Sequence, residues 1–348
     1  MNAGAAPVPR EFFGVSAVVP DDSDFRRMGK AGVGTYRVPV AWPAVQTHAD
    51  GPFDWSIPDR EFAGAVANGV QPFPVLFGSP RFAGRSEQAP PLDSGDARQG
   101  WQAFVAAAVR RYGPSGEFWA ENPQLPEKPV EAWQIWNEQN AQHFWRRKPS
   151  PRRYAALLRL ASTAINGVDP SARLVLGGMF GFPNGPRSIY LKDYLKRLYA
   201  VRSARKHFDA VAVHPYGGTL RLLRYQIQAA RRIMDRNGDK AVPIWVTETG
   251  WSTNGPRKWP LVTTPKGQAK LLKRSFGLLL RRRARWGIES VVWFAWRDFK
   301  QDLCRWCGGA GLLNLNGDPK PAWSRFKRFT AGTVEQPPVP APPPTPVP

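Results

Sequence analysis

The chain alternates short apolar runs with stretches of helical periodicity, and this alternation constrains the fold more than any other feature. Eight runs are almost continuously apolar, as expected for parallel strands that are covered on both faces. A strand followed by a helix, repeated along a chain, builds a parallel sheet, so the pattern indicates the α/β class. The runs cover residues 12–18, 35–42, 70–78, 130–138, 173–179, 208–216, 243–251 and 290–298.

The segments between these runs carry apolar residues at helical spacing and often end at glycine. Examples are residues 101–113, 151–167, 190–203 and 271–287. Eight strands that alternate with helices over about 320 residues predict a single-domain (β/α)8 TIM barrel. A doubly wound open sheet is the structural alternative. That fold favours a glycine-rich nucleotide loop after the first strand, and the first run has none.

The two ends of the chain have a different composition from the barrel region. We expect an N-terminal extension at residues 1–10, a barrel domain at 11–330 and a proline-rich tail or linker at 331–348. The tail, VEQPPVPAPPPTPVP, is typical of a disordered, extended polyproline segment without a core. The first residues contain no apolar stretch of the kind found in an intact signal peptide.

Composition excludes several classes of protein. With 42% apolar and 12% aromatic residues in 348, the chain can bury a large core and is not expected to be disordered. Its two cysteines, Cys304 and Cys307, are too few for a disulfide scaffold. No apolar stretch approaches the roughly 20 residues that a membrane-spanning helix needs, so we expect no membrane span.

The chain is strongly basic, with 49 Lys and Arg against 27 Asp and Glu and a net charge of +22. Such a charge suggests a polyanionic partner, which could be nucleic acid, acidic polysaccharide or anionic lipid. Most basic runs, however, lie in helical stretches such as residues 271–287, whose leucines and phenylalanine would line the opposite face. We therefore interpret these charges as solvated outer helix faces and expect no nucleic-acid partner, since no reader motif is present.

In a TIM barrel, reactive groups lie at the C-terminal ends of the strands and in the loops that follow. Two carboxylates, Glu138 and Glu248, end or lie within apolar runs, where a charged residue is otherwise costly to bury. Further polar and aromatic residues occupy similar positions, so these ends are the candidate site. They include Arg37, Trp42, Asn137, His214, Tyr216 and Trp296.

Four motifs at these strand ends resemble those of clan A retaining glycoside hydrolases. WQIWNEQN at 133–140 resembles their Asn-Glu acid/base motif, and VTETGWST at 246–253 resembles their nucleophile strand. HPY at 214–216 and WFAW at 293–296 resemble their motifs on strands six and eight. The similarity is to glycoside hydrolase families 39 and 5, including bacterial exopolysaccharide hydrolases, and it covers roughly residues 11–330. The chain has FGSP at 77–80 where family 5 usually ends strand three with histidine, which favours family 39.

The resemblance implies a glycosidase that hydrolyses O-glycosyl bonds of a polysaccharide or oligosaccharide by double displacement. In such enzymes one carboxyl group protonates the leaving oxygen and the other attacks the anomeric carbon. By resemblance, Glu138 is the acid/base and Glu248 the nucleophile. Because two nearby carboxylates oppose joint ionisation, Glu138 is expected to hold a proton and Glu248 to stay charged.

The remaining candidates are expected to bind the substrate or to assist the carboxylates. Arg37 and Tyr216 would favour the charge of Glu248, and Asn137 would donate to the sugar 2-hydroxyl. His214 would hydrogen-bond near the nucleophile or the sugar. Trp296 would form a floor under the reacting sugar, and Trp42 lies at a similar strand end.

We expect no cofactor and no metal, because the four histidines show no close ligand spacing. Cys304 and Cys307 could form a short disulfide or remain free thiols. We expect a monomer in the extracellular space or at the cell envelope. The alternative function is a non-catalytic carbohydrate-binding barrel on the envelope. A serine hydrolase of the nucleophile-elbow type is excluded, since no G-x-S-x-G occurs.

Overall fold

The computed structural model describes residues 7–146, 148–301 and 304–334. It contains a nine-stranded sheet in the order β5-β4-β3-β2-β1-β9-β8-β7-β6, in which all paired strands are parallel. Each of the eight predicted apolar runs overlaps a strand, and the fifth run also reaches into β6. The strands are β1 (Phe13–Ser16), β2 (Thr35–Ala41), β3 (Gln71–Phe77), β4 (Ala132–Ile135), β5 (Arg173–Leu176), β6 (Met179–Phe180), β7 (Val211–His214), β8 (Ile244–Thr249) and β9 (Ile288–Phe294).

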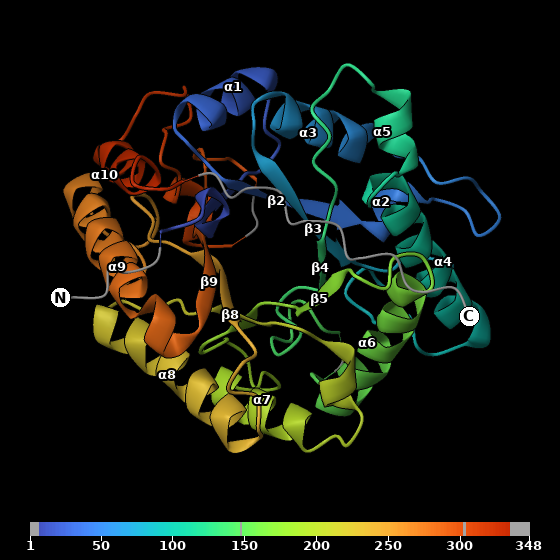
Figure 1. Ribbon diagram of the computed structural model, residues 1–348. Coiled ribbons are helices and arrows are strands. Elements are labelled where there is room, and N and C mark those ends of the chain that lie inside the picture. Colours follow the sequence, from blue (N-terminus) through green and yellow to red (C-terminus); the bar gives the residue numbers. More distant parts are fainter. Residues whose placement is uncertain (1–6, 147, 302–303, 335–348) are drawn as a thin grey trace.

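The sheet curls into a ring around the centre of the molecule (Figure 1). At the two ends of the strand order, Val175 of β5 forms a parallel bridge with Ala210, which directly precedes β7. The backbone N–H of Leu176 also donates to the carbonyl of Ala210 at 3.0 Å. The result is an α/β fold with a curled parallel sheet, consistent with a TIM-like barrel.

Helices form a layer outside the strands (Figure 1). Several begin at a Ser or Thr whose side-chain oxygen accepts a backbone N–H of the first turn, and this satisfies a donor that the helix itself leaves free. Ser94, Ser150, Thr219 and Thr264 do this for α4, α6, α8 and α9. The helices are α1 (Asp22–Lys30), α2 (Trp42–Val45), α3 (Ser56–Ala67), α4 (Gly95–Tyr112), α5 (Glu117–Glu121), α6 (Pro151–Asn166), α7 (Leu191–Tyr199), α8 (Leu220–Arg236), α9 (Pro265–Trp286) and α10 (Pro321–Thr330), with 3-10 turns η1 (Arg10–Phe12), η2 (Ala204–His207) and η3 (Cys307–Gly309).

The main hydrophobic core lies between the sheet and the helices, and a smaller cluster of Phe73, Val175, Ala210 and Ala212 lies apart from it. On α9, Leu272, Phe276 and Leu279 are buried, while most of the basic side chains of this helix are exposed, as the periodicity predicts. This packing fixes the strand ends in space, and with them the side chains of the candidate site.

The described ends of the chain lie beside each other, because Pro9 and Val334 form a parallel bridge. The proline-rich tail from residue 335 onward and the first six residues of the predicted extension lie outside the described residues. Within the described ranges, no helix has the length and apolar character needed to cross a bilayer.

Candidate active site

Five of the predicted site residues line one cavity of about 290 Å³. Arg37 comes from β2, Asn137 and Glu138 follow β4, Tyr216 follows β7, and Glu248 lies in β8. The barrel therefore brings together side chains that are up to 211 positions apart in the sequence. The walls of the cavity are mainly apolar, and their larger members are Phe77, Phe144, Phe180, Phe294 and Trp306.

The two carboxylates, Glu138 and Glu248, lie close together at the cavity. One oxygen of each, together with a ring nitrogen of His214, forms a group in which all atoms lie within 4.8 Å of one another. His214 Nδ1 is 2.8 Å from Glu138 Oε1 and 3.6 Å from Glu248 Oε2. Both carboxylates are largely buried, so their charges are poorly screened by water and interact strongly.

Glu248 is held by hydrogen bonds to both of its oxygens. Arg37 Nη1 donates to Oε1 at 2.6 Å, and the Tyr216 hydroxyl donates to Oε2 at 2.9 Å. Burial raises the pKa of Glu248, while the Arg37 charge and the Tyr216 hydrogen bond act in the opposite direction. Burial and the charge of Glu248 raise the pKa of Tyr216 well above its ordinary value, so its hydroxyl keeps the proton that it donates.

Glu138 has a less favourable environment for charge. Burial, followed by the charge of Glu248, raises the pKa of Glu138 well above its ordinary value, and Arg37 offsets this in part. Because Arg37 and Tyr216 both bond directly to Glu248, the shared proton belongs on Glu138. The two carboxylates thus differ in protonation through their surroundings, as is typical of acid/base pairs.

The backbone of the Asn-Glu segment is strained. Glu138 has a φ of 43° and Trp136 a φ of 70°, a left-handed conformation that side-chain-bearing residues rarely adopt. The Glu138 N–H donates to the carbonyl of Gly178 at 3.2 Å, and Asn137 Oδ1 accepts from Arg37 Nη2 at 2.8 Å. These bonds hold the strained segment and fix how its side chains enter the cavity.

Two residues that the sequence analysis did not select, Gln134 and Thr247, connect the charged groups beneath the cavity. Gln134 Oε1 accepts from Arg37 Nε at 2.7 Å, and Gln134 Nε2 donates to Thr247 Oγ1 at 3.1 Å. Thr247 Oγ1 lies 3.1 Å from His214 Nε2. A continuous path of hydrogen bonds therefore leads from Glu138 through His214, Thr247, Gln134 and Arg37 to Glu248.

This path sets the tautomer of His214. Gln134 uses its carbonyl for Arg37, so its amide donates to Thr247. The Thr247 hydroxyl has no other acceptor among the described residues, so its proton goes to His214 Nε2. His214 is then protonated on Nδ1, which donates to Glu138. Burial, followed by the Arg37 charge, lowers the pKa of His214 well below its ordinary value, so the ring is neutral.

Glycine at position 178 makes room for this histidine. A Cβ atom placed on Gly178 would overlap the imidazole ring of His214. The Gly-Gly pair that separates β5 from β6 thus allows the backbone to approach the buried ring closely. Gly178, near the start of the glycine-rich stretch at 177–186, thus leaves space for the His214 ring. The sequence pattern did not indicate this role.

Three of the predicted substrate contacts are not at the cavity. Trp42 is fully buried and packs against Phe82, Trp101 and Phe104. Trp296 is also fully buried, and its indole N–H donates to Asp24 at 3.0 Å; Phe294 faces the cavity in its place. His214 is inaccessible as well, and its ring contacts Glu138. The expected sugar contacts of Trp42 and Trp296 are therefore corrected. His214 was expected near the nucleophile or the sugar, and its Nδ1 lies 3.6 Å from Glu248 Oε2.

Ser16, at the end of β1, is a polar cavity residue that sequence reasoning missed. Ser16 is one of the residues that line the cavity, and its hydroxyl, which is shielded from solvent, has no hydrogen-bond partner among the described residues. A buried hydroxyl without a partner is costly, and a bound ligand can satisfy it. Its strand-end position was the available signal, but a lone serine carries little information in a sequence.

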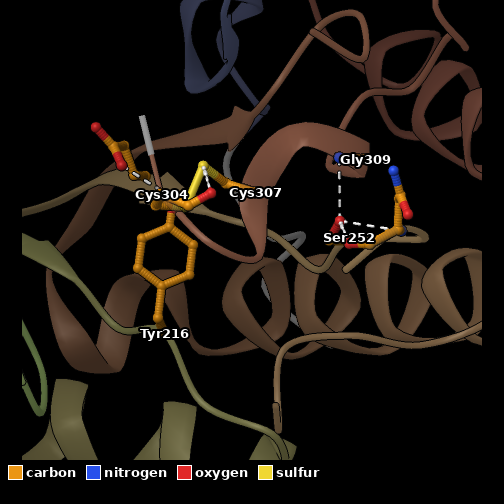
Figure 2. Close-up of a disulfide and its surroundings, with 7 residues drawn as sticks. Tyr216, Ser252, Cys304, Cys307 and Gly309 are labelled. Atoms are coloured by element: carbon orange, nitrogen blue, oxygen red, sulfur yellow. Dashed lines mark hydrogen bonds between the residues drawn. A yellow bond between two sulfur atoms is a disulfide. The ribbon is translucent and has the colours of Figure 1, made fainter. Parts of the chain in front are cut away.

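A disulfide joins Cys304 and Cys307 in the wall of the cavity, so the sequence alternative of free thiols does not apply. Figure 2 shows this disulfide beside the ring of Tyr216. Trp306, between the two cysteines, packs edge-on against Tyr216 with ring centroids 5.1 Å apart. The Ser252 hydroxyl accepts the N–H of Gly309 at 3.1 Å, which fastens the end of this loop to the segment after β8 (Figure 2).

The side chains of Glu138, His214 and Glu248 could in principle hold a metal ion. Two contacts oppose this use of the described residues. His214 already donates to Glu138, and the Arg37 guanidinium lies 2.6 Å from Glu248, where it would repel a cation. The arrangement fits a pair of carboxylates that share a proton better than a metal centre.

No family model matches the chain. Comparison with solved structures gives strong matches at low sequence identity. A family 39 glycoside hydrolase from Bacteroides cellulosilyticus aligns with a TM-score of 0.68 and 20% identity over 93% of this chain. The fold is shared with glycoside hydrolases. The chain spans 64% of the length of that enzyme.

Two further structures show the same likeness. A monomeric β-xylosidase from Caulobacter crescentus has a TM-score of 0.67 and 21% identity, and the match covers 94% of this chain and 69% of the xylosidase. A family 5, subfamily 18 protein from Bifidobacterium longum subsp. infantis has a TM-score of 0.65 and 16% identity, with 96% of this chain and 80% of that protein covered. The families are those that the strand-end motifs resemble.

Proposed function

We propose that the chain is a retaining O-glycoside hydrolase that acts on a polysaccharide or oligosaccharide. The observation that carries this proposal is that one carboxylate oxygen of Glu138 lies within 4.8 Å of one carboxylate oxygen of Glu248. Retaining enzymes hold their carboxyl groups roughly 5–5.5 Å apart, whereas inverting enzymes leave about 6.5–9.5 Å for a water molecule. The short separation supports direct attack by a carboxylate.

Glu248 is the proposed nucleophile. Arg37 and Tyr216 keep it ionised and fix its two oxygens, so that one of them attacks the anomeric carbon. The bond from that carbon to the leaving oxygen breaks as the bond to Glu248 forms, which gives a glycosyl-enzyme. Water then attacks the same carbon, releases the sugar and restores the carboxylate.

Glu138 is the proposed acid/base. Because His214 Nδ1–H donates to Glu138 Oε1, the proton of the neutral acid belongs on Oε2. That proton passes to the leaving oxygen in the first step, and the resulting carboxylate accepts a proton from water in the second. His214 is thus a positioning residue, and Thr247 and Gln134 position His214.

The fold and the cavity support a carbohydrate as the substrate. If β5 and β6 are counted as two parts of the fifth strand, the sheet has the eight strands of a (β/α)8 barrel. The names of the similar structures include β-xylosidases and a β-1,4-mannosidase, all of them carbohydrate enzymes. The aromatic walls suit the C–H faces of a sugar, while Asn137 and Ser16 offer polar contacts.

The disulfide supports a location in an oxidising compartment. Disulfides form and persist mainly in exported proteins and are rare in the reducing cytosol. The Cys304–Cys307 bond is therefore consistent with an enzyme of the extracellular space or the cell envelope.

Substitution of the two glutamates tests the proposal on a panel of aryl glycosides and polysaccharides. Glu248→Gln is expected to abolish turnover, and Glu138→Ala is expected to regain activity when azide replaces the missing group. Glu61→Gln is the matched control, because Glu61 is a buried carboxyl group that accepts from Tyr36 and does not line the cavity. Full activity of Glu248→Gln, or inverted product stereochemistry by NMR, would refute the proposal. Saccharide binding without release of reducing ends would favour the carbohydrate-binding alternative.

A further inference from the structure

Most of the net charge of the chain lies on three neighbouring helices. α8, α9 and α10 follow one another around one side of the barrel (Figure 1), and α9 packs against both of the others. These three helices contain 16 Lys and Arg residues and one acid, Asp235. They therefore carry a net charge of +15 out of the total of +22. We call their outer surface the basic face.

The opposite side of the barrel has a different charge. Helices α3, α4 and α5 together contain four Arg residues and five acids, a net charge of −1. They lie across the barrel from α9 (Figure 1). The net positive charge is thus not spread evenly over the surface but is concentrated on one side.

Most cations of the basic face are solvent-exposed, and the exposed ones form no ion pair with the described residues. Thirteen of the 16 are exposed, and none of these 13 belongs to an ion pair of the described residues. Lys266, Lys270 and Arg274 succeed one another at a spacing of four along α9, where like charges repel. An ordinary solvated face mixes both signs, so this arrangement costs stability that a bound polyanion would restore.

The shape and composition of the basic face indicate which polyanion fits. The three helices follow the curvature of the barrel, so a flat membrane would contact mainly one of them, whereas a flexible chain can cross all three (Figure 1). Among the described residues of the three helices, the exposed large apolar side chains are Leu222 and Tyr225 of α8, too few for the insertion of an apolar face into a membrane. The exposed aromatic ring of α8, Tyr225, already stacks on Phe182, and the exposed face of α9 offers none, so successive nucleobases have no row of rings on which to stack.

We propose that the basic face binds an acidic polysaccharide, a polymer that carries carboxylate groups. The choice of a polysaccharide among polyanions rests on the proposed function, since an enzyme that degrades carbohydrates acts where such polymers occur. α9 begins in the segment after β8, the strand that carries Glu248, so the face extends from the cavity end down the side of the barrel. A polymer on this face is held beside the cavity without occupying it.

The test removes charge from α9 and measures binding to polygalacturonate. Lys270, Arg274, Arg281 and Arg285 are exposed and lie within one stripe of the helix, so all four are changed to Gln. The matched control changes four exposed arginines on α3, α4 and α6 to Gln and removes the same net charge: Arg60, Arg110, Arg152 and Arg159. Dextran serves as the neutral polymer, and oligo-dT and vesicles containing phosphatidylglycerol serve as other anions.

The wild-type chain is expected to bind polygalacturonate and not dextran, with affinity that falls as salt is raised. The α9 variant is expected to lose about tenfold or more in affinity, and the control variant less than about twofold. Equal losses in both variants, α9-dependent binding that is tighter for oligo-dT or vesicles, or no binding in 0.15 M salt would each overturn the proposal. Hydrolysis of a small neutral aryl glycoside is measured separately. If no variant hydrolyses it, the proposed function fails while the binding result still stands on its own.

Discussion

Thr247→Val is the sharpest test of how the hydrogen-bond path places the proton on Glu138. Valine has nearly the same shape, but it removes the hydroxyl between Gln134 Nε2 and His214 Nε2, each 3.1 Å away. His214 Nε2 then loses its partner, whereas Gln134 Nε2 keeps the Leu176 carbonyl as an acceptor at 2.9 Å. The free energy of unfolding should therefore fall by at least about 1–3 kcal/mol. Without the hydroxyl, His214 can also take the tautomer whose Nδ1 accepts, which draws the Glu138 proton to Oε1 and away from the leaving group.

The assay compares substrates that differ in their need for acid catalysis. General acid catalysis typically contributes about 10²–10⁴-fold, and the tautomer change should cost part of this. We expect kcat/KM to fall by about 10–100-fold for a glycoside with a poor leaving group. For a dinitrophenyl glycoside, whose leaving group needs no proton, the expected change is less than about threefold.

Two variants control for structural damage. Thr249→Val makes the same change on the same strand, but the Thr249 hydroxyl is buried without a partner, so activity and stability should be unchanged or improved. Thr247→Ser keeps the hydroxyl and should retain most of the activity. Equal losses of Thr247→Val on both kinds of substrate would refute the role of His214 in placing the proton.

Three further predictions concern the same cavity. Ser16→Ala should raise KM by about 2–10-fold with little change in kcat, the effect of one lost neutral hydrogen bond, and initial rates over a range of substrate concentrations measure this. The pH profile of kcat/KM should be bell-shaped, with an acid limb from protonation of Glu248 and an alkaline limb from ionisation of Glu138. Glu138→Gln, assayed on an activated aryl glycoside, should lose the alkaline limb. An alkaline limb that persists in this variant would contradict the assignment of Glu138. Because the folded-state pKa of Glu138 is raised, its carboxyl group stabilises the fold only at low pH, and this contribution is lost as pH rises through that pKa. Glu138→Gln should therefore gain stability relative to the wild type between acid and neutral pH, as urea unfolding at both ends would show.

The strands were readable from the sequence because both faces of each strand are covered. Continuous apolar runs located every strand of the ring, and the strand-end rule selected Arg37, Glu138 and Glu248, which the fold brings together. This part of the prediction depends on periodicity and on the cost of burying charge, both of which are local properties of the chain.

The parts that failed depend on three-dimensional direction. After Phe294 the chain turns, so Trp296 points to Asp24 and not into the cavity, and no local pattern indicates such a turn. Gln134 and Thr247 lie inside strands, where a single polar residue does not disturb an apolar pattern and draws no notice. Their role in the hydrogen-bond path is visible only when their partners on other strands are known.

The path of hydrogen bonds from Glu138 to Glu248 has a consequence for how activity arises during synthesis and refolding. Its members come from β2, β4, β7 and β8, so no contiguous fragment short of nearly the whole ring contains them all. Hydrolysis should therefore appear in a single step when the last strand docks. A chain cut into two halves would be inactive until the halves recombine. The rate of hydrolysis would therefore measure the fraction of assembled barrels directly.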